Sequence, residues 1–491
     1  MEPAFGLMDG TRAKGAGLMK KLEKLVDRIV RRVGLSLRDQ KFDVAPYLRP
    51  CVPLRKLSQF YAFYGVTGQH PLHFHFSHSN LAGSYFLGKC RVDGSILYKS
   101  DIRGDELRSK GETFSYRGAR MTLDQDEVIS ISDSLLVKTL VHSRSHDPEN
   151  PEIFLIKNSA ACPFANIHGS PLEGSFLGAF ATADLTTLHG CVVGFFAYVQ
   201  VGELWHEKVE PGQIWINHPE AFDFRYRFPE KALAEYVRVE PGGLPKGRFM
   251  EFLNARKEDF RRVFDVVHLE PVSAVPKTSS LNRYAVIKPK TRIGANVLIA
   301  QRAYIENSTL GKGSNAQESC FIINSHLKGN NVTAHGAKLI NTDLQENVFV
   351  GFNSFLHGLP ESPLTIGRGS IVMPHTVIDI KEPVSIPSDH LVWGLVTSPY
   401  DLRMHSIPLE DLAAVTRMKT IGGMEFCGSG AKFVAAFQHR IHHVLEANGA
   451  YFDGRKNKGH AQKGQNISYN IIQPYRMGAL KGIYPTIDIQ P

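Results

Sequence analysis

The chain has 491 residues, of which 43% are hydrophobic and 21% charged, a balance typical of folded globular proteins and not of disordered ones. Its net charge of +9 can favour anionic partners such as CoA, nucleotides, phospholipid or nucleic acid, but ordinary solubility charge is the preferred explanation. We expect a cytoplasmic protein with no integral membrane segment, because no apolar run reaches the roughly 18 residues of a membrane span and the N-terminus has no apolar signal core. The six cysteines form no CxxC pair, which excludes a zinc cassette or a dense disulfide framework.

Residues 1–40 predict a basic amphipathic helix. Lysine and arginine side chains surround apolar residues at helical spacing: Leu18, Leu22, Leu25, Ile29 and Val33. Such a helix can lie on an anionic membrane surface, but packing on its own protein or on a sister subunit is the more common use and is what we expect here.

Residues 41–130 mix strand-like pieces with turns, and we expect them to cap the coil described next. His73 and His75 alternate along one such piece, and His142 and His146 follow in LVHSRSHD. Histidines on one strand face can begin a metal site, yet a polar, half-exposed face is the simpler interpretation. We therefore assign no metal to them.

The clearest pattern is a six-residue beat of aliphatic side chains over residues 281–395. Steps of six dominate, with slips to five, and after a short excursion the beat resumes at Ile366. The members are Ile287, Ile293, Ile299, Ile305, Leu310, Ala316, Ile322, Leu327, Val332, Leu339, Leu344, Val350, Leu356, Ile366, Val372 and Ile378. This period fits neither a helix nor an ordinary strand, and it is typical of a parallel β-helix in which each hexapeptide supplies a short strand and a corner. Glycine and asparagine between the beats suit corners that need φ above zero.

A looser version of the beat predicts a first β-helix block at residues 131–210. Its members are Ile156, Ala161, Ile167, Leu172, Leu177, Thr182, Leu188, Val193, Val199 and Leu204. Residues 211–280 break the pattern and predict an insertion with one helix, RFMEFLNARKEDFRRVFDVV. C-terminal helices are expected within 396–450 and an extended tail over 451–491, wrapping a neighbour. The predicted fold is thus mainly β, a left-handed parallel β-helix with an inserted helical arm and C-terminal α-helices.

On these repeats the sequence resembles the bacterial hexapeptide-repeat transferase superfamily, mainly acyltransferases that bind acyl-CoA between the subunits of a trimer. The segment NVFVGFNSFLHGLPESPLTIGRGSIVMPHTVIDI is similar to the part of sugar and antibiotic O-acetyltransferases where the coil pauses for a loop with the catalytic histidine. By position His357 matches that histidine, while Pro363, Ile366 and Gly367 match the restart of the coil. His-Gly stands here where the family often has His-Pro.

The resemblance implies CoA-dependent acyl transfer to a small sugar or amino-acid-like acceptor by a homotrimer, with acyl-CoA as cosubstrate, no metal and no nucleic acid. His357 is the first candidate for the general base and His335 the second, followed by His326. His-Gly also recurs at His168 and His189, and the pairs 168/189 and 335/357 are expected to lie close together. Five lysines are expected at solvated corners: Lys288, Lys290, Lys312, Lys328 and Lys338.

Two rival functions stay open at this point. The gamma-class carbonic anhydrases use the same trimeric coil and bind zinc through three histidines of two subunits, but their closely spaced histidine pair is not matched by His326 and His335. A non-catalytic β-helix scaffold is the other. Nucleotidyl transfer is disfavoured, because the first 150 residues contain no glycine-rich nucleotide loop.

Overall fold

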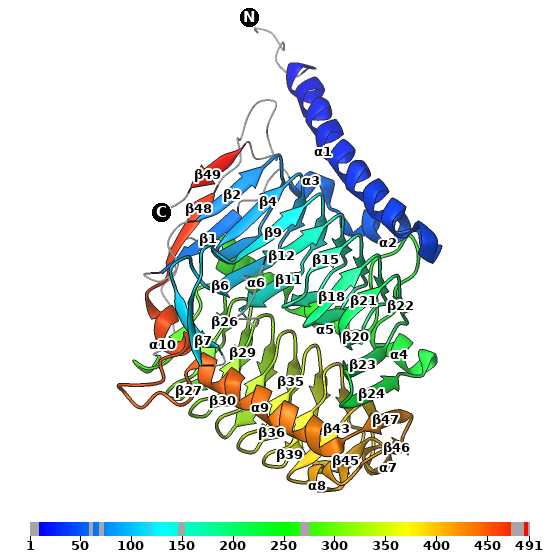
Figure 1. Ribbon diagram of the computed structural model, residues 1–491, viewed down its shortest axis with the longest axis vertical. Coiled ribbons are helices and arrows are strands. Elements are labelled where there is room, and N and C mark those ends of the chain that lie inside the picture. Colours follow the sequence, from blue (N-terminus) through cyan, green and yellow to red (C-terminus); the bar gives the residue numbers. More distant parts are fainter. Residues whose placement is uncertain are drawn as a thin grey trace, which may run out of the picture.

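Two left-handed parallel β-helices lie side by side in the computed structural model (Figure 1). The structure describes residues 9–57, 62–67, 73–116, 118–145, 153–265, 275–472 and 486–489. His146 lies outside these residues. The fold class predicted from the hexapeptide beat is confirmed.

The first β-helix has three long sheets, one for each face of its prism. The face that matters for the site runs in the order β3, β6, β11, β14, β17 and β20, which are Tyr85–Gly88, Asp101–Glu106, Leu140–Arg144, Asn166–His168, Thr182–Asp184 and Tyr198–Gln200. Successive coils are 16 residues long where Ile167 pairs with Ala183 and Ala183 with Val199. Two repeats of five residues and one of six add up to this 16-residue coil.

The second β-helix is built in the same way from longer coils. One of its sheets contains, among its eight strands, β28, β31, β34, β37 and β40, at Leu298–Ile299, Asn315–Ala316, Val332–Thr333, Phe349–Val350 and Ile371–Val372. The next is β29, β32, β35, β38, β41 and β44, at Tyr304–Glu306, Phe321–Ile323, Lys338–Ile340, Phe355–His357, Val377–Asp379 and Leu395–Val396. The pairings of Ile305, Ile322, Leu339 and Leu356 repeat every 17 residues, and the loop after His357 lengthens the next coil to Ile378.

The aliphatic beat matches the inward-facing residues except at two positions. Thr182 and Val332 were assigned to the interior, but Ala183 is the inward residue of the first coil and Thr333 pairs with Ala316 and Val350 in the second. Both assignments are off by one residue, and a shift of one residue moves a side chain to the opposite face of a strand. Val332 is buried in the cluster outside the second coil.

The segment boundaries differ from those expected. The parallel pairing already includes β1 (Ala62–Val66), so residues expected to cap the coil form its first turns. The 211–280 region holds an antiparallel hairpin, β23 (Gln213–His218) and β24 (Phe222–Arg227), and three helices: α4 (Glu230–Tyr236), α5 (Arg248–Ala255) and α6 (Lys257–Asp265). The tail strands β48 (Ser468–Ile472) and β49 (Ile487–Ile489) pair with the chain's own β1 and β2 (Phe74–Ser77).

Helices at both ends of the chain pack on the coils. The helix α1 (Asp9–Ser36) buries Leu22, Ile29 and Val33 in the cluster that contains Ile96 and Leu135 of the first β-helix, so it packs on its own protein. The helix α9 (Gly430–Asn448) contacts β24 and β34 and thus spans both β-helices (Figure 1). None of the helices in the described part of the chain combines the length and apolarity that a bilayer crossing requires.

The contact between the two β-helices is partly polar. The Arg302 guanidinium lies 2.8 Å from Asp101, and the Asn353 amide donates to the Phe180 carbonyl at 3.0 Å. Arg302 and Asn353 both lie at corners of the second β-helix, where the backbone φ is above zero. Corner residues of the second β-helix therefore contribute polar contacts to the first.

Lys338 was expected at a solvated corner, but it is only 2% exposed. It lies on β35, where its Nζ is 5.6 Å from the ring centroids of Phe180 and Phe249 and donates to the Gly336 carbonyl at 2.5 Å. Burial lowers the pKa of Lys338 to about 7. The cause is that the contact between the β-helices removes this charge from water.

A pH-dependent stability follows from this lysine. Between pH 7 and 9 the unfolded chain holds a proton on Lys338 that the folded chain releases, so the free energy of unfolding should rise with pH, by about 2 kcal/mol. Chemical denaturation at several pH values measures it. Lys338→Met should reduce the rise to the smaller part that comes from Lys99, whose pKa burial lowers to about 8. Lys328→Met, at a solvated corner, should keep the full rise, and an equal rise in the Lys338 variant would contradict the assignment.

Candidate functional site

His357 forms a pair with Asp379 on one face of the second β-helix. The two residues are direct neighbours in the register of β38 and β41, and Nδ1 of His357 lies 3.0 Å from a carboxylate oxygen of Asp379. The His357 side chain is 43% exposed, whereas that of Asp379 is 7% exposed. The carboxylate thus fixes Nδ1 as the protonated nitrogen and leaves Nε2 as a base.

The inserted helices complete this pair. The Tyr236 hydroxyl at the end of α4 donates to Asp379 at 2.9 Å, and the Arg248 guanidinium at the start of α5 pairs with the same carboxylate. Burial alone would raise the pKa of Asp379, but the hydrogen bonds from His357 and Tyr236 and the charge of Arg248 lower it below its usual value. Asp379 is therefore ionised at neutral pH and can stabilise a protonated His357.

His335 does not join His357 but belongs to a second cluster, between the two β-helices. Its ring is 2% exposed and its Nε2 lies 3.3 Å from Nδ1 of His142 on β11. His168 at the end of β14 completes the cluster, and one ring nitrogen from each histidine lies within 4.8 Å of the other two.

Each ring of this His142–His168–His335 cluster turns its other nitrogen toward a carboxylate. His168 Nδ1 lies 2.8 Å from Asp184, and His335 Nδ1 lies 2.7 Å from Glu318. His142 Nε2 lies 3.3 Å from Glu106. The cluster thus has three inward-facing nitrogens and three outer acids.

The three imidazoles are held in the neutral form. Burial lowers the pKa of His168 to about 3 despite the opposing effect of Asp184. Burial likewise lowers the pKa of His335 to about 3 and lowers the pKa of His142. Neutral imidazole offers a lone pair, and it is the form that binds metal ions.

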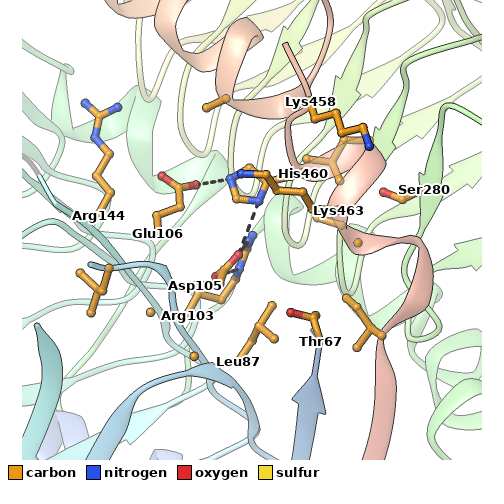
Figure 2. Close-up of a pocket in the computed structure, with 18 of the residues that line it drawn as sticks. Thr67, Leu87, Arg103, Asp105, Glu106, Arg144, Ser280, Lys458, His460 and Lys463 are labelled. Atoms are coloured by element: carbon orange, nitrogen blue, oxygen red, sulfur yellow. Dashed lines mark hydrogen bonds and ion pairs between the residues drawn. The ribbon is translucent and has the colours of Figure 1, made fainter. Parts of the chain in front are cut away.

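A cavity of about 760 Å³ lies beside this cluster, between the β-helices and the C-terminal segment. Figure 2 shows His460 of α10 (His460–Lys463) between the side chains of Glu106 and Asp105, with Lys458 and Lys463 on the side of the C-terminal segment. His460 Nε2 lies 2.9 Å from Glu106, and Arg103 pairs with Asp105 at 2.5 Å. The cavity wall is therefore strongly charged.

The expected His-Gly pairs do not form, and the coil lengths explain why. Gaps of 21 and 22 residues exceed the 16- and 17-residue coils by about one strand, so each pair falls on different faces. His189 instead stacks on Trp205 at 3.9 Å between ring centroids, and His326 is exposed on β33 (His326–Leu327). One coil after His168 comes Asp184, its partner in the register.

Sequence reasoning left His142 and His168 without a role, although a signal was present. Adding one coil length to His168 predicts the acidic neighbour Asp184, and Glu318 stands one coil before His335. The expectation that no metal binds rested on the spacing of His326 and His335, and the structure brings other histidines together.

Comparisons with known proteins agree with the fold. Residues 119–241 match the family model for a hexapeptide repeat including a loop. The bifunctional protein GlmU of Thermodesulfovibrio yellowstonii is 23% identical over 283 residues, 52% of this chain and 57% of that protein. The chain thus spans little more than half of that relative's length.

A solved structure is far more similar. A crystal structure from Desulfovibrio desulfuricans G20, provisionally described as an acetyltransferase, is 53% identical, with a TM-score of 0.89 over 96% of this chain and 99% of the other. At this identity and coverage the two chains share family as well as fold. The chain belongs to the hexapeptide-repeat transferase superfamily, whose fold is the left-handed parallel β-helix.

Proposed function

We propose that the protein transfers an acyl group from acyl-CoA to a hydroxyl or amine of a small acceptor, such as a sugar or amino-acid derivative. The observation that supports this best is the pairing of the partly exposed His357 with the buried Asp379. Acyl transfer needs a base that can reach the acceptor, and the partly exposed imidazole of this pair supplies one.

The proposed chemistry follows from the two ring nitrogens. The Nδ1–H group donates a hydrogen bond to Asp379 and keeps its proton, so Nε2 accepts the proton of the acceptor as its oxygen or nitrogen attacks the thioester carbonyl. Asp379 stabilises the resulting imidazolium. The tetrahedral intermediate then collapses, the carbon–sulfur bond breaks, and His357 returns the proton to the CoA thiolate.

His335 remains the alternative base in this proposal. Its burial and its contacts to Glu318 and His142 leave less room for a bulky thioester than His357 has. Assembly into a cytoplasmic homotrimer is also part of the proposal, although the two β-helices already form a groove within one chain.

Ligand binding and thiol release test the function together. Acetyl-CoA and succinyl-CoA at concentrations well above the dissociation constant should raise the melting temperature by a few degrees, because a ligand that binds only the folded state stabilises it. Free thiol should then appear only when an acceptor from a panel of amino sugars, sugars and amino acids is added. Absence of any stabilisation by either thioester would count against acyl-CoA as the donor.

A further inference from the structure

We propose that His142, His168 and His335 form a binding site for one divalent transition-metal ion of the zinc class, built between the two β-helices of a single chain. The site is separate from the His357–Asp379 pair and does not depend on acyl transfer. It draws two ligands from β11 and β14 of the first β-helix and one from the corner after β34 of the second.

The nitrogen positions suit such an ion. In a tetrahedral site with metal–nitrogen bonds of about 2.0–2.1 Å, two ligand nitrogens lie roughly 3.3 Å apart. The His142 Nδ1 and His335 Nε2 atoms are separated by 3.3 Å, and all three nitrogens lie within 4.8 Å of one another. A small inward movement of His168 would complete three corners of a tetrahedron.

The outer carboxylates support the same assignment. Metal-binding histidines usually hold their second ring nitrogen against a carboxylate, which fixes the tautomer and strengthens the ligand. Here Asp184, Glu318 and Glu106 lie at that nitrogen of His168, His335 and His142, respectively. Arg440 and Arg103 in turn pair with Asp184 and Glu318, so the acids are held in place. An ordinary buried histidine needs no such arrangement on each of three rings.

There is also room for the ion and a fourth ligand. A cavity of about 40 Å³ is lined by the three histidines, and a single water needs only roughly 10–15 Å³. This cavity shares Arg103, Glu106, Arg144 and His460 with the larger cavity of about 760 Å³. The open coordination position therefore faces a polar space that a small molecule can enter, as in catalytic and not structural zinc sites.

Metal analysis of the whole chain tests the site. Protein produced without a histidine tag should contain about one zinc per chain by mass spectrometry. After a chelator removes it, Co²⁺ titration should give the intense visible bands of a tetrahedral site at one equivalent, and zinc should abolish them. Wild-type protein that holds no metal and gives no such bands would overturn the proposal, whatever the variants do.

Variants locate the ion. His168→Ala and His335→Ala should each lose the bound zinc and the cobalt bands, whereas the exposed His326→Ala should keep both. Circular dichroism shows whether each variant is folded. Retention of stoichiometric metal by folded His168→Ala and His335→Ala would place the ion elsewhere and overturn the assignment.

Discussion

His357→Ala is expected to lower kcat for acyl transfer by about 10²- to 10⁴-fold, the range that a positioned general base contributes. The Michaelis constant for acyl-CoA should change little, because the proposed role of His357 is to transfer a proton and not to bind the CoA moiety. Steady-state thiol release measures both constants. The side chain is 43% exposed, so its removal should leave the melting temperature close to that of the wild type.

Asp379→Asn serves as the companion variant. An amide can hold His357 in either tautomer and cannot stabilise the imidazolium, so we expect a substantial but smaller loss of kcat with the fold retained. His326→Ala, an exposed histidine of the same β-helix, is the matched control and should keep full activity. Activity that survives His357→Ala but is lost in His335→Ala would move the base to the cluster between the β-helices.

Arg440→Met is expected to reduce the free energy of unfolding by about 3–5 kcal/mol, because it leaves a buried carboxylate without its cation. Arg440 lies on α9 and approaches Asp184 to within 2.7 Å, while Asp184 is fully buried. The Arg440 guanidinium also donates to Gln200 at 3.1 Å, and the Tyr198 hydroxyl donates to Asp184. Guanidinium or urea denaturation measures the loss.

The double variant Arg440→Met/Asp184→Asn separates the charge effect from lost packing. Removing both charges should recover much of the stability, since no unpaired ion remains in the interior. Arg225→Met removes an exposed arginine that pairs with Asp223 and should cost at most about 1 kcal/mol. A loss from Arg440→Met as small as that of Arg225→Met would show that the Arg440–Asp184 pair does not hold α9 on the first β-helix.

The repeat could be predicted from sequence because its signal is local. Ile305, Ile322, Leu339 and Leu356 stack on one another at a constant interval, so the beat alone predicts the coil and its interior. His357 was predicted as a site residue from the sequence because its segment resembles the loop that carries the catalytic histidine in sugar and antibiotic O-acetyltransferases. Its partner Asp379 lies on the next coil, and adding the length of one coil and its loop to the position of His357 predicts this neighbour.

The cluster between the β-helices could not be predicted in the same way. His168 and His335 are far apart in the chain, and their contact depends on how two coils dock, which no periodicity encodes. The errors at Thr182 and Val332 have the same origin. The Thr182 hydroxyl forms a hydrogen bond of 2.9 Å with His375 of the second β-helix. Thr182 therefore faces the contact between the two β-helices and not the interior of its own coil.

The most direct test of the proposed function is a crystal structure of the protein with bound CoA. The proposal predicts the CoA sulfur within about 3.5 Å of His357 Nε2, the approach that reacting groups require. A CoA sulfur located away from His357, for example in the cavity beside His142, His168 and His335, would contradict it.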